Sequence, residues 1–156
     1  MIAWVLVLGR TYDNQDCSAA RALELIGERW SLLIVRDAAL RGMTRFAEFQ
    51  RSLGVASNIL NKRLDDFVAA GLMERRPVPG HAGHQEYVLT PRGLELQPIV
   101  LALSAWGDRW AAPDGPPVHF EHRDCGGTAL QDVHCTTCGD RLAGADVVAR
   151  PAANTA

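Results

Sequence analysis

The sequence of 156 residues has no apolar run as long as a membrane-spanning helix, which needs roughly 20 residues. It lacks the basic segment and small-residue cleavage site of a secretion signal, so we expect a cytoplasmic protein with no membrane partner. Aromatic residues are few, at 6%, but the 47% hydrophobic content is that of a globular protein. Four cysteines in such a chain favour thiols or metal ligands over a disulfide scaffold.

Motifs of common enzyme active sites are also absent. The sequence contains no G-x-S-x-G, no glycine-rich phosphate loop of the Walker or dinucleotide type, and no H-E-x-x-H. We therefore expect that the protein is not an enzyme and requires no cofactor for its activity.

Basic charge is concentrated in the middle of the chain, although the net charge is −2. Residues 41–76 carry seven basic and four acidic side chains, a local charge of +3. Residues 113–156 carry three basic and six acidic side chains, a local charge of −3. This pattern indicates an anionic partner for the middle segment.

Apolar residues recur at helical spacing through the first 70 residues. The pattern predicts a helix over 19–26, a buried helix that ends before Gly42, a third helix capped by Thr44, and a fourth over 58–70. Strands are predicted over 72–78 and 85–89, joined by a glycine-containing loop. Thr90 and Pro91 then begin a long helix to about Trp110, bent at Pro98.

Three helices followed by a hairpin is the element order of a winged helix. We predict a mainly α fold with a small β-hairpin wing, in the α+β class, with a helix-turn-helix over 44–70. The predicted divisions are an N-terminal extension (1–16), a winged-helix domain (17–112), a linker (113–117), a small Cys/His-rich β unit (118–142) and a flexible end (143–156).

In a helix-turn-helix the second helix enters the DNA major groove, and its first residues meet base edges. Asn can bind adenine, and Lys or Arg can bind guanine or phosphate. The residues predicted to face the groove are Ser57, Asn58, Asn61, Lys62 and Arg63. Arg45, Arg75 and Arg76 are predicted to meet phosphates, although the last two fit equally well as solvated charge beside the hairpin. The alternative for the whole set is an ordinary solvated helix face.

The chain also resembles the HxlR-type transcriptional regulators, relatives of the MarR group, over about residues 17–110. The motifs that carry the resemblance are Cys17–Trp30, Arg45–Gln50, Leu60–Leu64, Gly71–Arg75, Glu86–Thr90 and Trp106-Gly107. The resemblance implies a homodimeric winged-helix repressor or activator. It further implies double-stranded DNA with a pseudo-palindromic operator as the partner, read by one recognition helix and one wing per half.

Two positions depart from the family pattern. Ala56-Ser57 stands where family members usually have Ser-Pro, so we expect the helix cap to shift to Ser57. The wing carries only His81 and His84, near a position where the family commonly has a basic residue. These histidines predict a wing whose minor-groove contact is weak or pH-dependent.

Two apolar segments point to dimerisation. The helix that ends at Trp110 offers more aromatic area than the core of one small domain needs, which is typical of interfaces. The extension before residue 15 is apolar, and a disordered leader is the alternative to a dimer contact there. The residues predicted to contact a second copy are Trp4, Leu6, Leu103, Trp106 and Trp110.

Cys17 stands just before the first predicted helix, where a helix N-terminus favours the thiolate, and Arg21 one turn later would add to this. In the family that the chain resembles, some members use a cysteine here to sense oxidants or electrophiles. Cys17 is therefore a candidate redox sensor, and the alternative is a small residue packed near the dimer interface.

The tail holds two pairs of metal-ligand type, His122-x2-Cys125 and Cys135-x2-Cys138, each followed by glycine. This spacing predicts one structural zinc held by all four residues, with His119 or His134 as substitutes for His122. The alternatives are a metal-free hairpin, or a disulfide from Cys125 to Cys135 or Cys138. With its negative charge the tail is not expected to bind DNA.

Together these patterns predict a homodimeric, sequence-specific DNA-binding regulator, in the first instance a repressor, with a small-molecule or oxidant effector that the sequence does not identify. The alternative is a winged-helix module for protein interaction or thiol-redox chemistry without specific DNA binding. Salt dependence of DNA affinity distinguishes the two.

Overall fold

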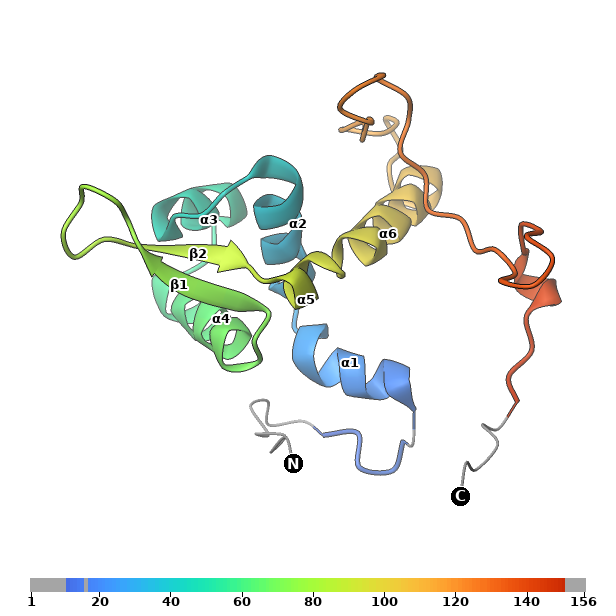
Figure 1. The fold of residues 1–156 in the computed structure, drawn as a ribbon, viewed down its shortest axis with the longest axis horizontal. Helices are drawn as coiled ribbons and strands as arrows, with labels where there is room; N and C mark the ends of the chain where they lie inside the picture. The colour runs from blue at the N-terminus through green and yellow to red at the C-terminus, as the bar shows by residue number, and fades with distance from the viewer. Residues whose placement is uncertain (1–10, 16, 151–156) are drawn as a thin grey trace. The chain divides into compact units, whose positions relative to one another are not determined.

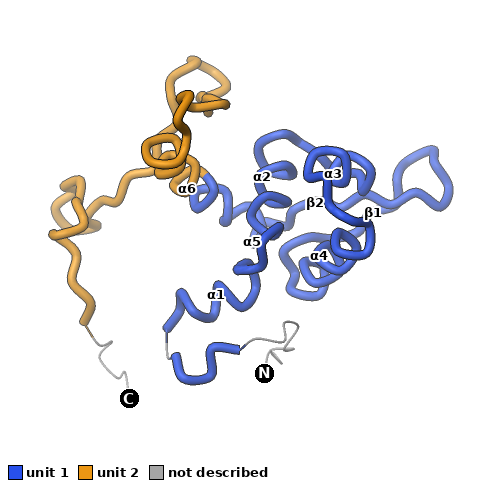
Figure 2. Tube along the Cα trace, turned by 180° about the vertical axis from the view of Figure 1, so that it is seen from behind, with its two compact units in different colours: residues 1–100 blue, residues 101–156 orange. Residues whose placement is uncertain are grey.

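The computed structural model describes residues 11–15 and 17–150, and the chain divides into two compact units, residues 1–100 and 101–156 (Figure 2). The first unit has the predicted α+β architecture of helices and one hairpin (Figure 1). In the described residues no helix is both long and apolar enough to cross a membrane. The elements are α1 (Ser18–Ile26), α2 (Ser31–Arg41), α3 (Phe46–Leu53), α4 (Ser57–Ala69), β1 (Met73–Pro77), β2 (Gln85–Leu89), α5 (Pro91–Leu94) and α6 (Gln97–Trp110).

The helix-turn-helix consists of α3, a short turn and α4. Gly54 ends α3 at a φ of +61°. This is a left-handed backbone conformation, which residues other than glycine adopt only with strain. Its N–H donates to the carbonyl of Gln50 at 2.9 Å, and Val55 in the turn is buried. The helix-turn-helix predicted from apolar spacing and glycine is therefore present, with helix ends shifted by one or two residues.

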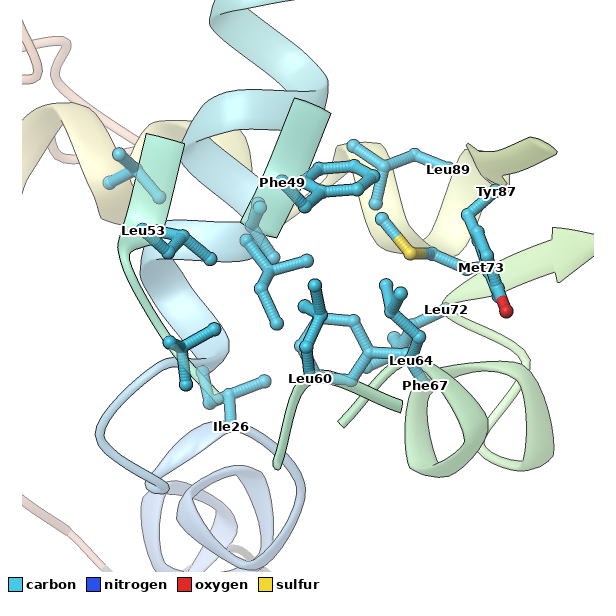
Figure 3. Close-up of a cluster of buried hydrophobic side chains, with 14 residues drawn as sticks. Ile26, Phe49, Leu53, Leu60, Leu64, Phe67, Leu72, Met73, Tyr87 and Leu89 are labelled. Carbon is cyan, nitrogen blue, oxygen red and sulfur yellow. The ribbon is translucent and has the colours of Figure 1, made fainter. Parts of the chain in front are cut away.

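The core fixes the direction in which α4 points (Figure 3). Phe49 of α3, Leu60 and Leu64 of α4 and Ile34 of α2 are fully buried, and Met73 of β1 is 1% exposed. These side chains come from four elements and pack into one cluster. Since one face of α4 is held by this cluster, its opposite face is presented outward.

The hairpin is antiparallel, with Met73 opposite Leu89 and Pro77 opposite Gln85. The first strand is shorter than the predicted 72–78, whereas the second has its predicted bounds. The N–H of Tyr87 donates to the carbonyl of Thr44 at 2.7 Å. This bond fastens β2 to the segment just before α3, so the hairpin and the helix-turn-helix are parts of one unit.

The single long helix predicted from Pro91 to Trp110 is wrong, because the structure has two helices, α5 and α6. Thr90 does cap α5, since its Oγ1 accepts the N–H of Gly93 at 3.1 Å. Pro98 has no N–H for the carbonyl of Leu94, and its ring would collide with that carbonyl in a continuous helix. The helix therefore ends at Leu94, and Pro98 lies in the first turn of α6 instead of bending a single helix.

The predicted β unit after residue 117 is not confirmed. Between residues 111 and 150 the structure has two isolated bridges, Glu121 to Thr128 and His134 to Arg141, and a short 3-10 helix, Gly144–Asp146. No longer strand is formed in this part of the chain. The tail is a succession of turns.

Candidate functional site

The outward face of α4 carries Asn58, Asn61 and Lys62, all exposed. They lie opposite Leu60 and Leu64, which are fully buried. All three are in the N-terminal half of the helix, the part that approaches base edges in helix-turn-helix proteins. Amide and ammonium groups in this position are the types that read adenine and guanine edges.

Arg63 does not share this face, contrary to the prediction. It is only 8% exposed, and its Nη1 lies 3.3 Å from the carboxylate of Asp66. The reason is helical geometry: Arg63 follows Leu60 by three residues and precedes Phe67 by four, and both of these are in the core. Arg63 is therefore an ion-pair partner on the core side of α4 and does not lie on its exposed face.

Both acidic residues of α4 are paired with basic side chains. Asp66 accepts a hydrogen bond from Lys62 Nζ at 3.2 Å and forms an ion pair with Arg63, and Asp65 pairs with Arg75 of β1. The outward face of α4 therefore does not present unpaired negative charge. The Lys62 side chain is exposed, and ion pairs made by exposed side chains are worth about 1 kcal/mol or less, so a phosphate or base can displace the carboxylate.

Ser57 is the first residue of α4, and Ala56 is its cap, so the predicted shift of the cap to Ser57 is wrong. The Oγ of Ser57 accepts a hydrogen bond from Nε2 of Gln50 in α3 at 2.6 Å. This bond ties the two helices across the turn at the edge of the exposed face. Gln50 was not predicted, because its role depends on a contact made only after the turn has formed.

The start of α3 is capped by Glu48 and not by Thr44. Glu48 Oε2 accepts the N–H groups of Thr44 at 3.0 Å and Arg45 at 2.9 Å, and Arg45 is the cap residue. The hydrogen bonds from Arg45 and Thr44 hold the pKa of Glu48 below its usual range. The carboxylate thus occupies the N–H groups of Thr44 and Arg45 just before the helix, so these two groups are not free to meet a phosphate. The half-buried side chain of Arg45 remains a predicted phosphate contact.

We expect Glu48→Ala to lower the free energy of unfolding by about 1 kcal/mol at neutral pH, the usual cost of a lost cap. Since the pKa of Glu48 is lowered in the folded state, its stabilisation is present above the unfolded pKa and is lost as pH falls through the folded one. Urea denaturation at neutral and acidic pH measures this, with exposed Glu28→Ala as the control. A difference from wild type that persists undiminished in acid contradicts the cap assignment.

The two arginines of β1 point to opposite sides of the hairpin, as neighbours in a strand must. Arg75 faces α4: it pairs with Asp65, and its Cζ lies 5.6 Å from the ring centroid of Tyr87. The contact with Tyr87, supported by Asp65, raises the pKa of Arg75. Arg76 pairs with Glu74 on the other side. Arg75 thus links the hairpin to α4, a role that the linear sequence did not reveal.

The tip of the hairpin is built from two successive turns. Val78 donates to the carbonyl of His84 at 3.0 Å, and the N–H of His84 donates to the carbonyl of His81 at 3.1 Å. The two imidazole rings are exposed and lie edge to face, with centroids 6.0 Å apart. The tip therefore presents two imidazoles and no arginine or lysine to a nucleic acid.

Cys17 occupies the cap position of α1 with an exposed, free thiol. The Arg21 side chain makes its hydrogen bonds elsewhere. Its guanidinium donates to Glu24 Oε1 at 2.6 Å and to the carbonyls of Tyr12 and Gln15 at 3.0 and 2.8 Å. Arg21 therefore fastens residues 12–15 to α1.

An apolar stripe runs along α6. Ile99, Leu103, Trp106 and Trp110, spaced three or four residues apart, are 44%, 53%, 61% and 69% exposed. Such a face on one helix is typical of a surface that packs against another chain. Trp4 and Leu6, predicted to join it, lie outside the described residues.

The tail brings its predicted metal ligands together in pairs. His122 Nδ1 lies 3.1 Å from Cys125 Sγ, and the backbone N–H groups of Cys138 and Thr137 lower the pKa of Cys135 to about 7. All three tail thiols are free. Across residues 11–15 and 17–150 no three or more potential ligands meet at one point, so the structure does not gather the predicted set of four, nor a set that includes His119 or His134.

Comparison with known proteins places this geometry in a family. The family model for HxlR-like helix-turn-helix proteins matches residues 25–115, which include the helix-turn-helix, the hairpin and α6. The helix-turn-helix-type transcriptional regulator Rv3095 of Mycobacterium tuberculosis is 39% identical over 135 residues, which cover 86% of this chain and 85% of the relative.

Solved structures agree with this assignment. The crystal structure of PA1607, a protein assigned as a transcription factor, is similar with a TM-score of 0.81 and 40% identity, over 90% of this chain and 99% of that one. The redox regulator HypR, solved in its reduced form, is similar with a TM-score of 0.54 and 29% identity, over 60% of this chain and 92% of that one. Such proteins regulate transcription and are not enzymes. The chain belongs to the HxlR-like helix-turn-helix family of transcriptional regulators.

Proposed function

We propose that the protein acts in the cytoplasm as a homodimer that binds a pseudo-palindromic operator and represses transcription there. The observation that carries the proposal is the exposed N-terminal half of α4, with Asn58, Asn61 and Lys62 side by side. The hairpin that Arg75 fastens to α4 is the wing. A dimer matches the two-fold symmetry of such an operator, with one α4 in each half-site.

The alternative is a protein-interaction or thiol-redox module, and fluorescence anisotropy with the DNA upstream of its own gene distinguishes the two. We expect saturable binding whose logarithm falls linearly with the logarithm of salt concentration, and weaker binding to random DNA. Expression of a reporter gene placed downstream of the bound DNA tests repression. Weak binding that is equal for random DNA overturns the proposal in favour of the interaction module.

We include Cys17 in the proposal as the thiol through which an oxidant acts. Its support is an exposed thiol at the start of α1, together with the similarity of the chain to the redox regulator HypR. The same anisotropy assay with hydrogen peroxide tests it. Loss of DNA binding in wild type but not in Cys17→Ser supports the assignment, and equal loss in both removes it.

We expect Trp106→Ala combined with Trp110→Ala to convert the dimer to monomers. Tryptophans at the centre of an interface contribute about 2 kcal/mol or more each, and a dimer of the double variant lacks four of them, so the dissociation constant should rise by about 10⁵-fold or more. Light scattering coupled to size exclusion measures the mass. Val148→Ala, which truncates a side chain 69% exposed in the tail, is the matched control and should stay dimeric. A double variant that remains dimeric places the interface elsewhere.

A further inference from the structure

The tail contains two consecutive copies of one turn, thirteen residues apart, in residues 120–129 and 133–142. In the first copy the N–H of His122 donates to the carbonyl of Gly127 at 2.7 Å, and that of Gly126 returns to His122 at 2.8 Å. In the second copy Cys135 donates to Asp140 at 2.9 Å, and Gly139 returns to Cys135 at 2.9 Å. The backbone repeats bond for bond.

The two copies are also equivalent on either side of these hydrogen bonds. The bridges from Glu121 to Thr128 and from His134 to Arg141 occupy equivalent positions. Gly126 and Gly139 both have positive φ, 70° and 80°. The copies are therefore equivalent in hydrogen bonding, in strand bridge and in the residue that permits the tight turn.

Each copy carries a potential ligand at its third and sixth positions, which are His122 and Cys125 in one and Cys135 and Cys138 in the other. The His122 Nδ1 to Cys125 Sγ distance of 3.1 Å is close to the roughly 3.5 Å that separates nitrogen and sulfur ligands of one tetrahedral zinc. The alignment of the two copies also indicates which histidine is the ligand. His122 is the counterpart of Cys135, whereas His134 is the counterpart of Glu121 and His119 of Asp132.

A second, independent observation is that residues 113–150 form hydrogen-bonded turns without a core. No residue from 113 to 150 is buried, and Leu130 and Val133 are 69% and 58% exposed. Segments below about 40 residues that hold a fixed structure usually need disulfides, a metal or a partner. The three cysteines of this segment are free, so disulfides do not supply the stabilisation.

We propose that His122, Cys125, Cys135 and Cys138 bind one divalent transition ion, Zn²⁺ by ligand type, in a closed tetrahedral site. The two turns are the halves of this site. Residues 130–132, which join the copies, bend to bring the halves onto the ion, since the structure holds them as separate pairs. The three thiols release their protons to solvent and the imidazole binds in its neutral form, so binding is coupled to folding of the tail.

The test uses the full-length, reduced protein and Co²⁺ alone as the probe. We expect saturation at one Co²⁺ per chain, the intense visible bands of tetrahedral coordination, and displacement by Zn²⁺. Cys125→Ser and Cys138→Ser should each lower the thiolate charge-transfer band by about one third, because three thiolates contribute. Cys17→Ser and His134→Gln are the matched controls and should leave spectrum and stoichiometry unchanged.

Limited proteolysis gives a readout of folding. With Zn²⁺ bound, trypsin should cleave after Arg123 and Arg141 more slowly, and a chelator should restore the rate. Two ions per chain, weak octahedral bands, or tight binding that survives the combined Cys125→Ser and Cys138→Ser changes would each overturn the four-ligand site. DNA binding is measured separately, so failure here leaves the regulatory proposal intact.

Discussion

Replacing Asn58 and Lys62 together with alanine is expected to lower the affinity for operator DNA by about 100-fold or more while the protein stays folded. The two residues are one helical turn apart on the exposed face of α4, and neither contributes to the core. A side chain that reads a base edge contributes about 1–3 kcal/mol to discrimination, and a phosphate contact adds affinity for any sequence. The loss of both explains the size of the effect.

Anisotropy at several salt concentrations separates the two contributions. If Lys62 meets a phosphate, Lys62→Ala alone should reduce the slope of log affinity against log salt by about 0.9 and weaken all sequences alike. Asn58→Ala alone should instead reduce the preference for operator over random DNA. Arg150→Ala removes an equal charge from an exposed tail position and should leave DNA affinity unchanged.

Arg63→Ala is expected to affect stability, in contrast to the changes at Asn58 and Lys62. Arg63 is buried beside Asp66, so its removal leaves a nearly buried carboxylate with one partner fewer and should lower the melting temperature.

Wild-type affinity in a folded Asn58→Ala, Lys62→Ala protein would show that α4 does not enter the groove. The interaction module would then become the leading explanation of the exposed face.

The periodicity of apolar residues predicted most of the fold because burial on one side is a local property of the sequence. Phe49 and Leu53 recur at helical spacing, and so do Leu60, Leu64 and Phe67, and all five lie in the core. Glycine after a helix also predicted the correct end of α2, since Gly42 follows its last residue and adopts a positive φ. The HxlR-type resemblance added the family, and the family match bears it out.

The errors arose where two local preferences competed. Thr44 is a good cap by type, but the Glu48 carboxylate reaches the same N–H groups and makes Arg45 the cap residue. Arg63 is polar by type, but its helix position is on the core side. Contacts between distant residues, such as Arg75 with Asp65, depend on how β1 packs on α4, and no spacing rule encodes them.

Gly93 lies where two chain segments approach each other closely, and replacing it is expected to lower stability strongly. A Cβ atom added to Gly93 in α5 would lie 2.1 Å from the carbonyl oxygen of Leu72 and 2.9 Å from Leu89 Cδ2. The same two segments are joined by Thr90 Oγ1, which donates to the carbonyl of Gly71 at 2.7 Å. This joint connects the C-terminal end of α4 to the start of α5, and glycine is the residue that lets the backbones meet.

We expect Gly93→Ala to lower the free energy of unfolding by about 3 kcal/mol or more, because a backbone carbonyl cannot rotate away as a side chain can. Gly144→Ala, where an added Cβ meets nothing within 4 Å, is the matched control and should change stability by less than about 0.5 kcal/mol. Urea denaturation of both variants measures the difference. Since the joint positions the end of α4, the Gly93→Ala protein should also bind operator more weakly at temperatures where it is still folded. A Gly93→Ala protein as stable as Gly144→Ala would mean that the two segments separate at little cost, and that the joint does not fix α4.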